Sequence, residues 1–202
     1  SLMVLAWASL FLGGWWTLGL PLVTFGLVPA AELVLSGTKA NLPIEAEPET
    51  KDRPIYDLLL YAVVPSQVGL VALLMYQIGS GALVGAEIFG AILTVGVSCG
   101  AFAINVGHEL GHRHTRFDQA MAKILLVTSM YGHFFIEHNR GHHARVATPN
   151  DPASAERGIT VYAFWLRSVT AGWISAWHIE DRRLRKLDRP RLTWQNEMTR
   201  LT

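Results

Sequence analysis

The chain has 202 residues, of which 50% are hydrophobic and 16% are charged, with seven tryptophans, a single cysteine and a mean hydropathy of +0.27. Soluble domains carry about 25% charged residues, so this composition argues against a soluble domain. One cysteine can form neither an internal disulfide nor a thiolate cluster for zinc or iron–sulfur, so a bound metal would have to be held by histidine and carboxylate side chains.

The formal net charge of +1 conceals two halves of different character. Residues 1–105 hold 3 Lys and Arg against 7 Asp and Glu, a net charge of −4. Residues 106–202 hold 14 against 9, a net charge of +5. An apolar, slightly acidic half is therefore followed by a more polar, basic half.

The N-terminal part of the chain has the apolar length of membrane-spanning helices. No charged residue lies between Leu2 and Ala31, and Gly13-Gly14 interrupts this run. Because a span needs roughly 20 apolar residues, we expect 2–12 to be the end of one span and 15–35 to be the next. A signal peptide fits less well, since no basic segment precedes the run and the run is too long.

A polar loop at 36–56 follows, and after it come two more apolar runs. The first extends over 57–78 and the second over 82–106, where only Glu87 interrupts the apolar sequence. Gly79-Ser80-Gly81 separates the two runs, which predicts an antiparallel pair of spanning helices joined by a tight turn.

The positions of Lys and Arg predict how these helices are oriented. The turns at 13–14 and 79–81 contain none, the loop at 36–56 contains three, and the chain after Val106 contains fourteen. By the positive-inside rule, the basic half faces the cytoplasm.

Two later apolar stretches, Ile124–Ile136 and Ile159–His178, are mixed with polar residues and predict helices that lie in the membrane interface. The expected fold is therefore an all-α integral membrane helical bundle, with about four spanning helices and further interfacial cytoplasmic helices. Residues 1–106 are expected to supply the transmembrane helices and one cytoplasmic loop, and residues 107–202 to form a region on the cytoplasmic face. We expect the two to be parts of one incomplete domain.

Most of the eight histidines fall between His108 and His143. The first group reads H-E-L-G-H at 108–112, and residues at i and i+4 lie on one helix face, so both imidazoles can reach one metal. In a helix that begins at Ala82, His108 lies about 39 Å along the axis at 1.5 Å per residue. The hydrocarbon layer is about 30 Å thick, which predicts that the pair lies at the cytoplasmic edge of the membrane.

The second histidine group reads E-H-N-R-G-H-H at 137–143. His138 and His142 repeat the i, i+4 spacing, and His143 points about 100° away round the helix, which suits a second metal or a bridging arrangement. Five imidazoles without a cysteine suit a late first-row metal. They exceed the three or four ligands of one zinc ion, so two iron ions account for them best.

Other readings of the histidines remain open. H-E-x-x-H is also the zinc-protease signature, in which Glu109 would act as general base of an intramembrane metalloprotease. That reading leaves the second group unexplained, and the chain lacks the L-D-G segment that supplies an aspartate ligand in such proteases. A carboxylate-bridged di-iron bundle needs two E-x-x-H pairs, whereas Glu109 and His112 form one and Glu137 does not begin another. A membrane scaffold that binds no metal is a further alternative.

Longer motifs resemble a known family. They are N-V-G-H-E-L-G-H-R at 105–113, F-D-x-x-M-A-K at 117–123, Y-G-H-F-F-I-E-H-N-R-G-H-H at 131–143 and V-A-T-P-x-D-P-A at 146–153. These segments resemble the membrane-bound alkane 1-monooxygenases, which belong to the histidine-box superfamily of integral-membrane desaturases and hydroxylases. Because one H-x-x-x-H box does not separate hydroxylase from desaturase, a related desaturase remains a second possibility.

The resemblance implies iron ligation by the residues of its first two boxes: His108, His112, His138, His142 and His143. Family members also carry a lone histidine in an E-H-Y-G segment and a third box ending H-x-x-H-H. After His143 this chain has only His178, so we expect it to be truncated, to represent most of the first half of an enzyme, and to be inactive alone. No catalytic residue is expected beyond the metal ligands.

Polar residues next to the boxes are candidates for a supporting role. A ligating imidazole usually donates its other N–H to a neighbouring acceptor, which fixes its tautomer. The candidates for such contacts are Glu109, His133, Glu137, Asn139 and Asp151.

The reaction that the resemblance implies inserts one atom of dioxygen into the terminal C–H bond of an alkane, giving a primary alcohol and water. Two iron ions are the implied cofactors, and rubredoxin with rubredoxin reductase are the implied electron donors. The basic segment 182–191 would steer an acidic carrier or, equally, anchor the chain to anionic membrane lipid. The implied location is a bacterial inner membrane, with several spans and a cytoplasmic active site, and no nucleic-acid partner is expected.

Overall fold

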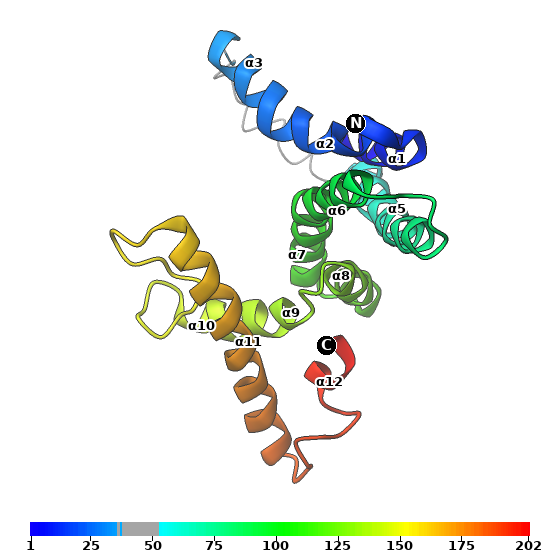
Figure 1. Ribbon diagram of the computed structural model, residues 1–202. Helices are drawn as coiled ribbons and strands as arrows, with labels where there is room; N and C mark the ends of the chain where they lie inside the picture. The colour runs from blue at the N-terminus through cyan, green and yellow to red at the C-terminus, as the bar shows by residue number, and fades with distance from the viewer. Residues whose placement is uncertain (36, 38–52) are drawn as a thin grey trace. The chain divides into compact units, whose positions relative to one another are not determined.

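The computed structural model describes residues 1–35, 37 and 53–202, and within these ranges every regular element is helical (Figure 1). This confirms the predicted all-α fold class. Most of the predicted loop at 36–56 lies outside the described residues. Contacts between residues divide the chain into two compact units, Ser1–Val106 and Gly107–Thr202, and each unit is described by itself.

Within the described residues, the first unit consists of helices and short helical turns. Its elements are α1 (Leu2–Leu12), the 3-10 turn η1 (Gly14–Leu18), α2 (Gly19–Leu22), the π-helical turn η2 (Val23–Leu27), α3 (Val28–Val34), α5 (Pro54–Gly79), α6 (Ala86–Ser98) and the π-helical turn η4 (Cys99–Ile104). Helix α7 (Asn105–His112) continues directly from η4 and crosses the boundary between the units, so the first histidine group that it carries belongs to the second unit.

Among the described residues, three helical stretches are long and apolar enough to cross a membrane: Gly14–Val34, Pro54–Gly79 and Ala86–His112. They correspond to three of the predicted spans. Leu2–Leu12 is also apolar, but its 11 residues fall short of the roughly 20 that a full span needs.

The last of these stretches begins at Ala86, four residues later than expected. Gly85 has a φ of 54°, a left-handed conformation that interrupts a helix and favours glycine. The Glu87 carboxylate accepts hydrogen bonds from the backbone N–H groups of Val84 (3.3 Å) and Gly14 (2.9 Å). Glu87 therefore lies in the first turn of α6, where a negative charge is favoured by the helix dipole, and not in the middle of a span.

The apolar side chains of the first unit are divided between an interior and an outward surface. The interior cluster comprises Ala6, Leu10, Leu20, Leu70, Leu74, Leu83, Ala91 and Val95. Large side chains also point outward, such as Phe25 at 73% and Leu33 at 89% exposure, which suits contact with lipid rather than water. Gln67 is fully buried, where it accepts a hydrogen bond from Ser98 Oγ (2.7 Å) and donates one to Cys99 Sγ (3.3 Å).

Two glycines of α6 predict a measurable difference in packing. A Cβ at Gly90 would come 2.9 Å from Thr17 Cβ and 3.2 Å from the Thr17 carbonyl carbon, whereas a Cβ at Gly96 would meet nothing within 4 Å. We expect Gly90→Ala to destabilise the protein by about 1–3 kcal/mol relative to Gly96→Ala, because an overpacked contact must separate. Thermal unfolding in detergent checks this difference. Equal midpoints for the two variants would show that η1 does not pack closely on α6.

The second unit carries the remaining helices. They are α8 (Arg116–Thr128), α9 (His133–Glu137), the π-helical turn η5 (His138–His142), α10 (His143–Arg145), α11 (Val161–Arg185) and α12 (Glu197–Leu201). Helix α11 packs against α9, η5 and α12. The N-cap residue of α8 is Thr115, whose Oγ1 accepts from Asp118 N at 3.0 Å, and that of α12 is Asn196, whose Oδ1 accepts from Met198 N at 2.8 Å.

The two stretches predicted as interfacial helices are helical, with one interruption. Ile124–Ile136 is divided between α8 and α9, because Met130 adopts a φ of 52° and the Tyr131 N–H donates back to Leu126 O at 2.8 Å. Most of Ile159–His178 forms the N-terminal part of α11. With 25 residues α11 is long enough to span a membrane, yet it is not among the three apolar stretches that qualify.

Candidate metal centre

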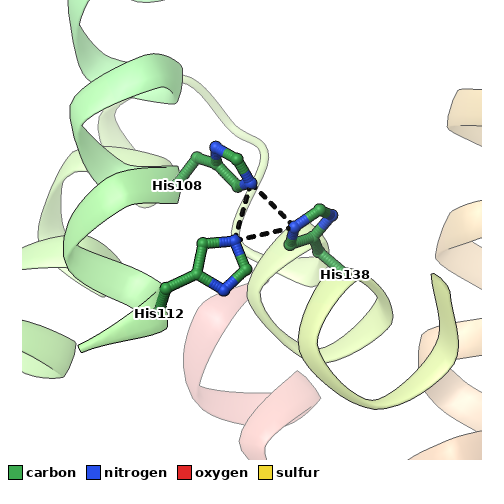
Figure 2. A group of neighbouring side chains, drawn as sticks. All are labelled: His108, His112 and His138. Carbon is green, nitrogen blue, oxygen red and sulfur yellow. Dashed lines mark hydrogen bonds between the residues drawn. The ribbon is translucent and has the colours of Figure 1, made fainter. Parts of the chain in front are cut away.

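Three histidines from two helical segments bring their imidazole nitrogens together (Figure 2). His108 and His112 lie one turn apart on α7, and His138 is the first residue of η5. The Nε2 atom of His108 lies 2.8 Å from that of His112 and 2.8 Å from that of His138. The remaining pair, His112 and His138, is 3.1 Å apart. The two sequence groups, 30 residues apart, thus form one cluster.

His143 joins this cluster, whereas His142 is held by a carboxylate. The Nε2 atom of His143 lies 3.1 Å from that of His138. His142 instead turns its Nδ1 atom toward Asp151 Oδ2 at 2.9 Å, and its ring stacks on the His138 ring with 5.2 Å between centroids. All five predicted ligands therefore lie in one region: three converge through their Nε2 atoms, His143 contacts His138, and His142 stacks on His138.

The π-helical turn explains this change of partner. The sequence pairs His138 with His142 at i, i+4, but in the structure the close nitrogen contact is with His143 at i, i+5. A π-helical turn bonds i to i+5 and is wider than an α-helical turn, which brings residue i+5 nearer to the face of residue i. Gly141 lies inside this turn, where a Cβ would come 2.5 Å from the Glu137 carboxyl carbon.

The nitrogen separations indicate the geometry that the cluster can offer an ion. With metal–nitrogen bonds of about 2.1 Å, two ligand nitrogens are about 3.0 Å apart at a 90° angle and about 3.4 Å apart at the tetrahedral angle. The separations of 2.8, 2.8 and 3.1 Å correspond to the smaller angle. Three neighbouring nitrogens at about this angle leave further coordination positions of a bound ion open.

The protonation state of His138 also suits a metal ligand. Burial, followed by the positive charges that His108 and His143 would carry, lowers the pKa of His138 to about 3. The imidazole is therefore neutral at pH 7 and its lone pair is available, as metal binding requires.

Asp151 is the supporting residue with the clearest contact to a predicted ligand. Its side chain is fully buried and accepts hydrogen bonds from His142 Nδ1 (2.9 Å), Ser154 Oγ (2.5 Å) and the Ala153 N–H (3.0 Å). Burial would raise the pKa of Asp151, but these hydrogen bonds outweigh burial and leave it below its ordinary value. The carboxylate is therefore ionised and holds His142 with its Nδ1 protonated.

Glu137 is buried beside the cluster without touching it. Its Oε1 accepts from Arg145 Nη2 at 2.7 Å, while its Oε2 has no hydrogen-bond partner among the described residues. Burial raises the pKa of this carboxyl, against the opposing effects of Ser175 and Arg145. A cavity of about 30 Å³, lined in part by Glu137, His138 and His142, lies beside it and has room for a water molecule.

The other three supporting candidates make contacts away from the ligand nitrogens. Asn139 Nδ2, in η5, donates to the Phe135 carbonyl of the preceding helix α9 at 2.9 Å. His133 is buried edge-on to the Tyr131 ring, and burial lowers its pKa. The side chain of Glu109 is 59% exposed and lies 3.9 Å from Arg113.

Sequence reasoning missed Arg140 and its acidic partners. Arg140 lies within η5, between two predicted ligands, and its guanidinium contacts the carboxylates of Glu180 on α11 and Glu197 on α12. Glu180 and Arg183 have the i, i+3 spacing of an ordinary exposed ion pair on a helix. The local sequence therefore does not indicate that Glu180 is fully buried.

Comparison with known proteins identifies the family. The family model described as fatty acid desaturase matches residues 84–201, which include every predicted ligand. The alkane 1-monooxygenase of Ectopseudomonas oleovorans is 37% identical over 177 residues, which cover 88% of this chain and 44% of that protein. Alkane 1-monooxygenase 1 of Alcanivorax borkumensis is 36% identical over 174 residues, which cover 86% and 43%. An alkane 1-monooxygenase of Pseudomonas putida is 35% identical over 176 residues, which cover 87% and 44%.

These matches agree with the resemblance found in the histidine boxes and give no support to the metalloprotease alternative. The chain spans less than half the length of these relatives. Together with the three apolar helices, the matches identify a membrane protein with a histidine cluster suited to metal. The chain therefore belongs to the fatty acid desaturase family, and over most of its length it is similar to the alkane 1-monooxygenases.

Proposed function

We propose that this chain forms part of a di-iron monooxygenase that hydroxylates the terminal carbon of alkanes to primary alcohols, using dioxygen and externally supplied electrons. The observation that carries the proposal is the convergence of the Nε2 atoms of His108, His112 and His138 within a region shared with alkane 1-monooxygenases. His143, 3.1 Å from His138, extends the set, and His142 completes the five imidazoles.

The donor set fits iron. Three imidazole nitrogens 2.8 to 3.1 Å apart leave further coordination positions of one ion open, and five imidazoles exceed what one ion would take from these two segments. Bound iron supplies the oxidant, which is needed because an unactivated alkane offers neither an acidic proton nor a carbonyl to polarise. We expect two iron ions, held by His108, His112, His138, His142 and His143 together with ligands from the remainder of the protein.

The chain's own residues orient a ligand and provide an apolar surface suited to lipid. Asp151 accepts the Nδ1–H of His142 and so directs the Nε2 lone pair of that ring to a metal. Glu109, His133, Glu137 and Asn139 remain candidates for the same kind of support. The outward apolar surface of the first unit supports a position in the bilayer, from which an alkane would enter.

We infer that the protein lies in a bacterial inner membrane with its histidines on the cytoplasmic side. The Ala86–His112 helix has 27 residues, a length of about 40 Å at 1.5 Å per residue. The hydrocarbon layer is about 30 Å thick, so the end that carries His108 and His112 can extend beyond it. The excess of Lys and Arg after Val106 favours the cytoplasmic side for that end.

The metal content and the product test the proposed reaction. We expect purified full-length protein to bind about two iron ions and to convert octane to 1-octanol with dioxygen when rubredoxin and rubredoxin reductase supply electrons. Iron analysis and gas chromatography measure both results. One bound zinc with cleavage of a membrane peptide would indicate a protease instead, and an alkene product would indicate a desaturase.

The basic segment at the end of α11 provides a second prediction. Arg182, Lys186 and Arg189 are exposed, whereas Arg183 pairs with Glu180 and Arg191 lies over the Trp177 ring. Reversal of the three exposed charges to Glu is expected to slow reduction by rubredoxin about tenfold or more at low salt and to remove most of its salt dependence. Stopped-flow kinetics over a range of ionic strength measure this effect, and an unchanged iron content serves as the control. Unchanged electron-transfer kinetics would exclude a role of the segment in docking rubredoxin and would favour its role as an anchor to anionic membrane lipid.

A further inference from the structure

Arg140 joins the second histidine box to two other helices. It lies inside the π-helical turn His138–His142, two residues from a predicted ligand on either side. Its Nη1 atom donates to Glu180 Oε1 at 2.6 Å, and its Nη2 atom donates to Glu197 Oε2. These partners are 40 and 57 residues away in the sequence, on α11 and α12. One guanidinium therefore connects three helical segments of the second unit.

The two carboxylates are buried and fully engaged. Glu180 is 0% exposed and also accepts from both ends of the Arg183 guanidinium (2.8 and 2.7 Å) and from the Glu197 N–H (2.8 Å). Glu197 accepts from Lys123 Nζ on α8 at 2.6 Å. Burial would raise the pKa of both carboxyls, but these hydrogen bonds outweigh burial and hold each pKa below its ordinary value.

A buried ion-pair network of this kind contributes more to fixing the arrangement of helices than to the free energy of unfolding. Buried ion pairs are often no more stabilising than apolar residues of the same size, but removal of one partner leaves an uncompensated charge. Such networks are consequently suited to fixing one arrangement of the segments that they join. Here the segment that is fixed contains His138 and His142.

A second contact fastens the other end of the same segment to α11. Arg145 Nη2 donates to Glu137 Oε1 at 2.7 Å and to Ser175 Oγ at 2.8 Å. The box is thus attached to α11 both within the π turn, through Arg140, and just after it, through Arg145. A π-helical turn is less regular than an α-helix and persists where its surroundings hold it in place.

We propose that Arg140, through its bridge to Glu180 and Glu197, is a positioning residue that holds the second histidine box in the π-helical conformation that brings His138 and His143 to the metal centre. The Arg140 guanidinium binds Glu180 and Glu197, so Arg140 acts on the histidines through the backbone of the turn. The proposal rests on the proposed metal-binding function of the histidines. Arginine is required because a planar fork can serve two carboxylates at once, which a lysine ammonium cannot do with the same geometry.

The test measures metal binding and coordination rather than turnover. Metal-free full-length protein is titrated with Co²⁺ against a competing chelator, and the visible absorption of the bound ion is recorded. We expect Arg140→Gln to weaken Co²⁺ affinity about 10–100-fold, as loss of an outer contact to a metal site typically does, and to alter the absorption bands. Arg140→Lys should recover part of the affinity. Arg157→Gln, which makes the same change at an exposed arginine, is the control and should behave as wild type.

Glu197→Gln provides a second variant should Arg140→Gln fail to fold, because it removes the charge from the far end of the bridge and carries the same expectation. Wild-type affinity and wild-type absorption bands in the variants would overturn the positioning role. A lower thermal midpoint of the metal-free protein with unchanged bands would also overturn it, since that result indicates a structural role only. Failure of the wild-type protein itself to bind Co²⁺ would overturn the proposed metal centre and the positioning role with it.

Discussion

Full-length protein carrying His138→Ala is expected to lose the iron of the histidine cluster and, with it, measurable alkane hydroxylation. The reason is the central place of His138, whose Nε2 atom lies within 3.1 Å of the Nε2 atoms of His108, His112 and His143. Its loss removes the imidazole that contacts three others in the cluster.

The effect should be large. Outer contacts to metal sites typically contribute 10–100-fold in affinity or activity, so loss of a ligand should exceed about 100-fold in octane turnover. Iron analysis of purified protein and product formation measure the two effects. His114→Ala is the matched control, since His114 is an exposed histidine just beyond the first box and outside the cluster. A His138→Ala variant that retained wild-type iron content would contradict the ligand assignment.

Asp151→Asn is expected to weaken metal binding about 10–100-fold with little change in the fold. The buried Asp151 carboxylate accepts the Nδ1–H of His142, which directs the other ring nitrogen outward. An amide of the same size accepts this hydrogen bond more weakly, and its NH₂ group can instead favour the opposite tautomer. The ligand would then present a protonated nitrogen to the metal.

Chelator competition for Fe²⁺ measures the predicted loss, and circular dichroism reports whether the helices persist. Asp188→Asn is the matched control, because Asp188 is exposed and its φ of 53° is a conformation that asparagine tolerates. Equal Fe²⁺ affinity in the two variants would mean that His142 does not depend on Asp151 for its orientation.

The features that sequence could predict are those with a local cause. A span follows from an uninterrupted apolar run, and the pairing of His108 with His112 follows from the pitch of one helix. The sequence could also predict that the two histidine groups lie close together. Several imidazoles within a short stretch indicate a metal site, and a shared site requires the two groups to converge. Asp151 could be proposed because it closely follows the second box, but its hydrogen bond to His142 is known only from the structure.

The features that sequence could not predict depend on distant contacts or on small departures from regular geometry. Helix α6 begins at Ala86 and not at the predicted Ala82, because the left-handed conformation of Gly85 and the hydrogen bond from the Val84 N–H to Glu87 fix its N-terminus. The network of Arg140 joins residues up to 57 positions apart, and nothing in the local pattern around Glu197 indicates such a partner. The exposed position of Glu109 could not be foreseen because the H-E-x-x-H spacing alone does not give the orientation of its second residue.

The π-helical turn in the second box has a consequence for insertions and deletions. A π turn contains one residue more than the α-helical turn that it replaces, so removal of a single residue between His138 and His143 would let the segment return to an α-helix. The imidazole now at 143 would then lie at i+4 from His138, still on the same face, whereas the imidazole now at 142 would shift to i+3, even though every histidine was retained. In this protein the number of residues in a helical turn therefore constrains the metal centre as strictly as the identity of the ligands does.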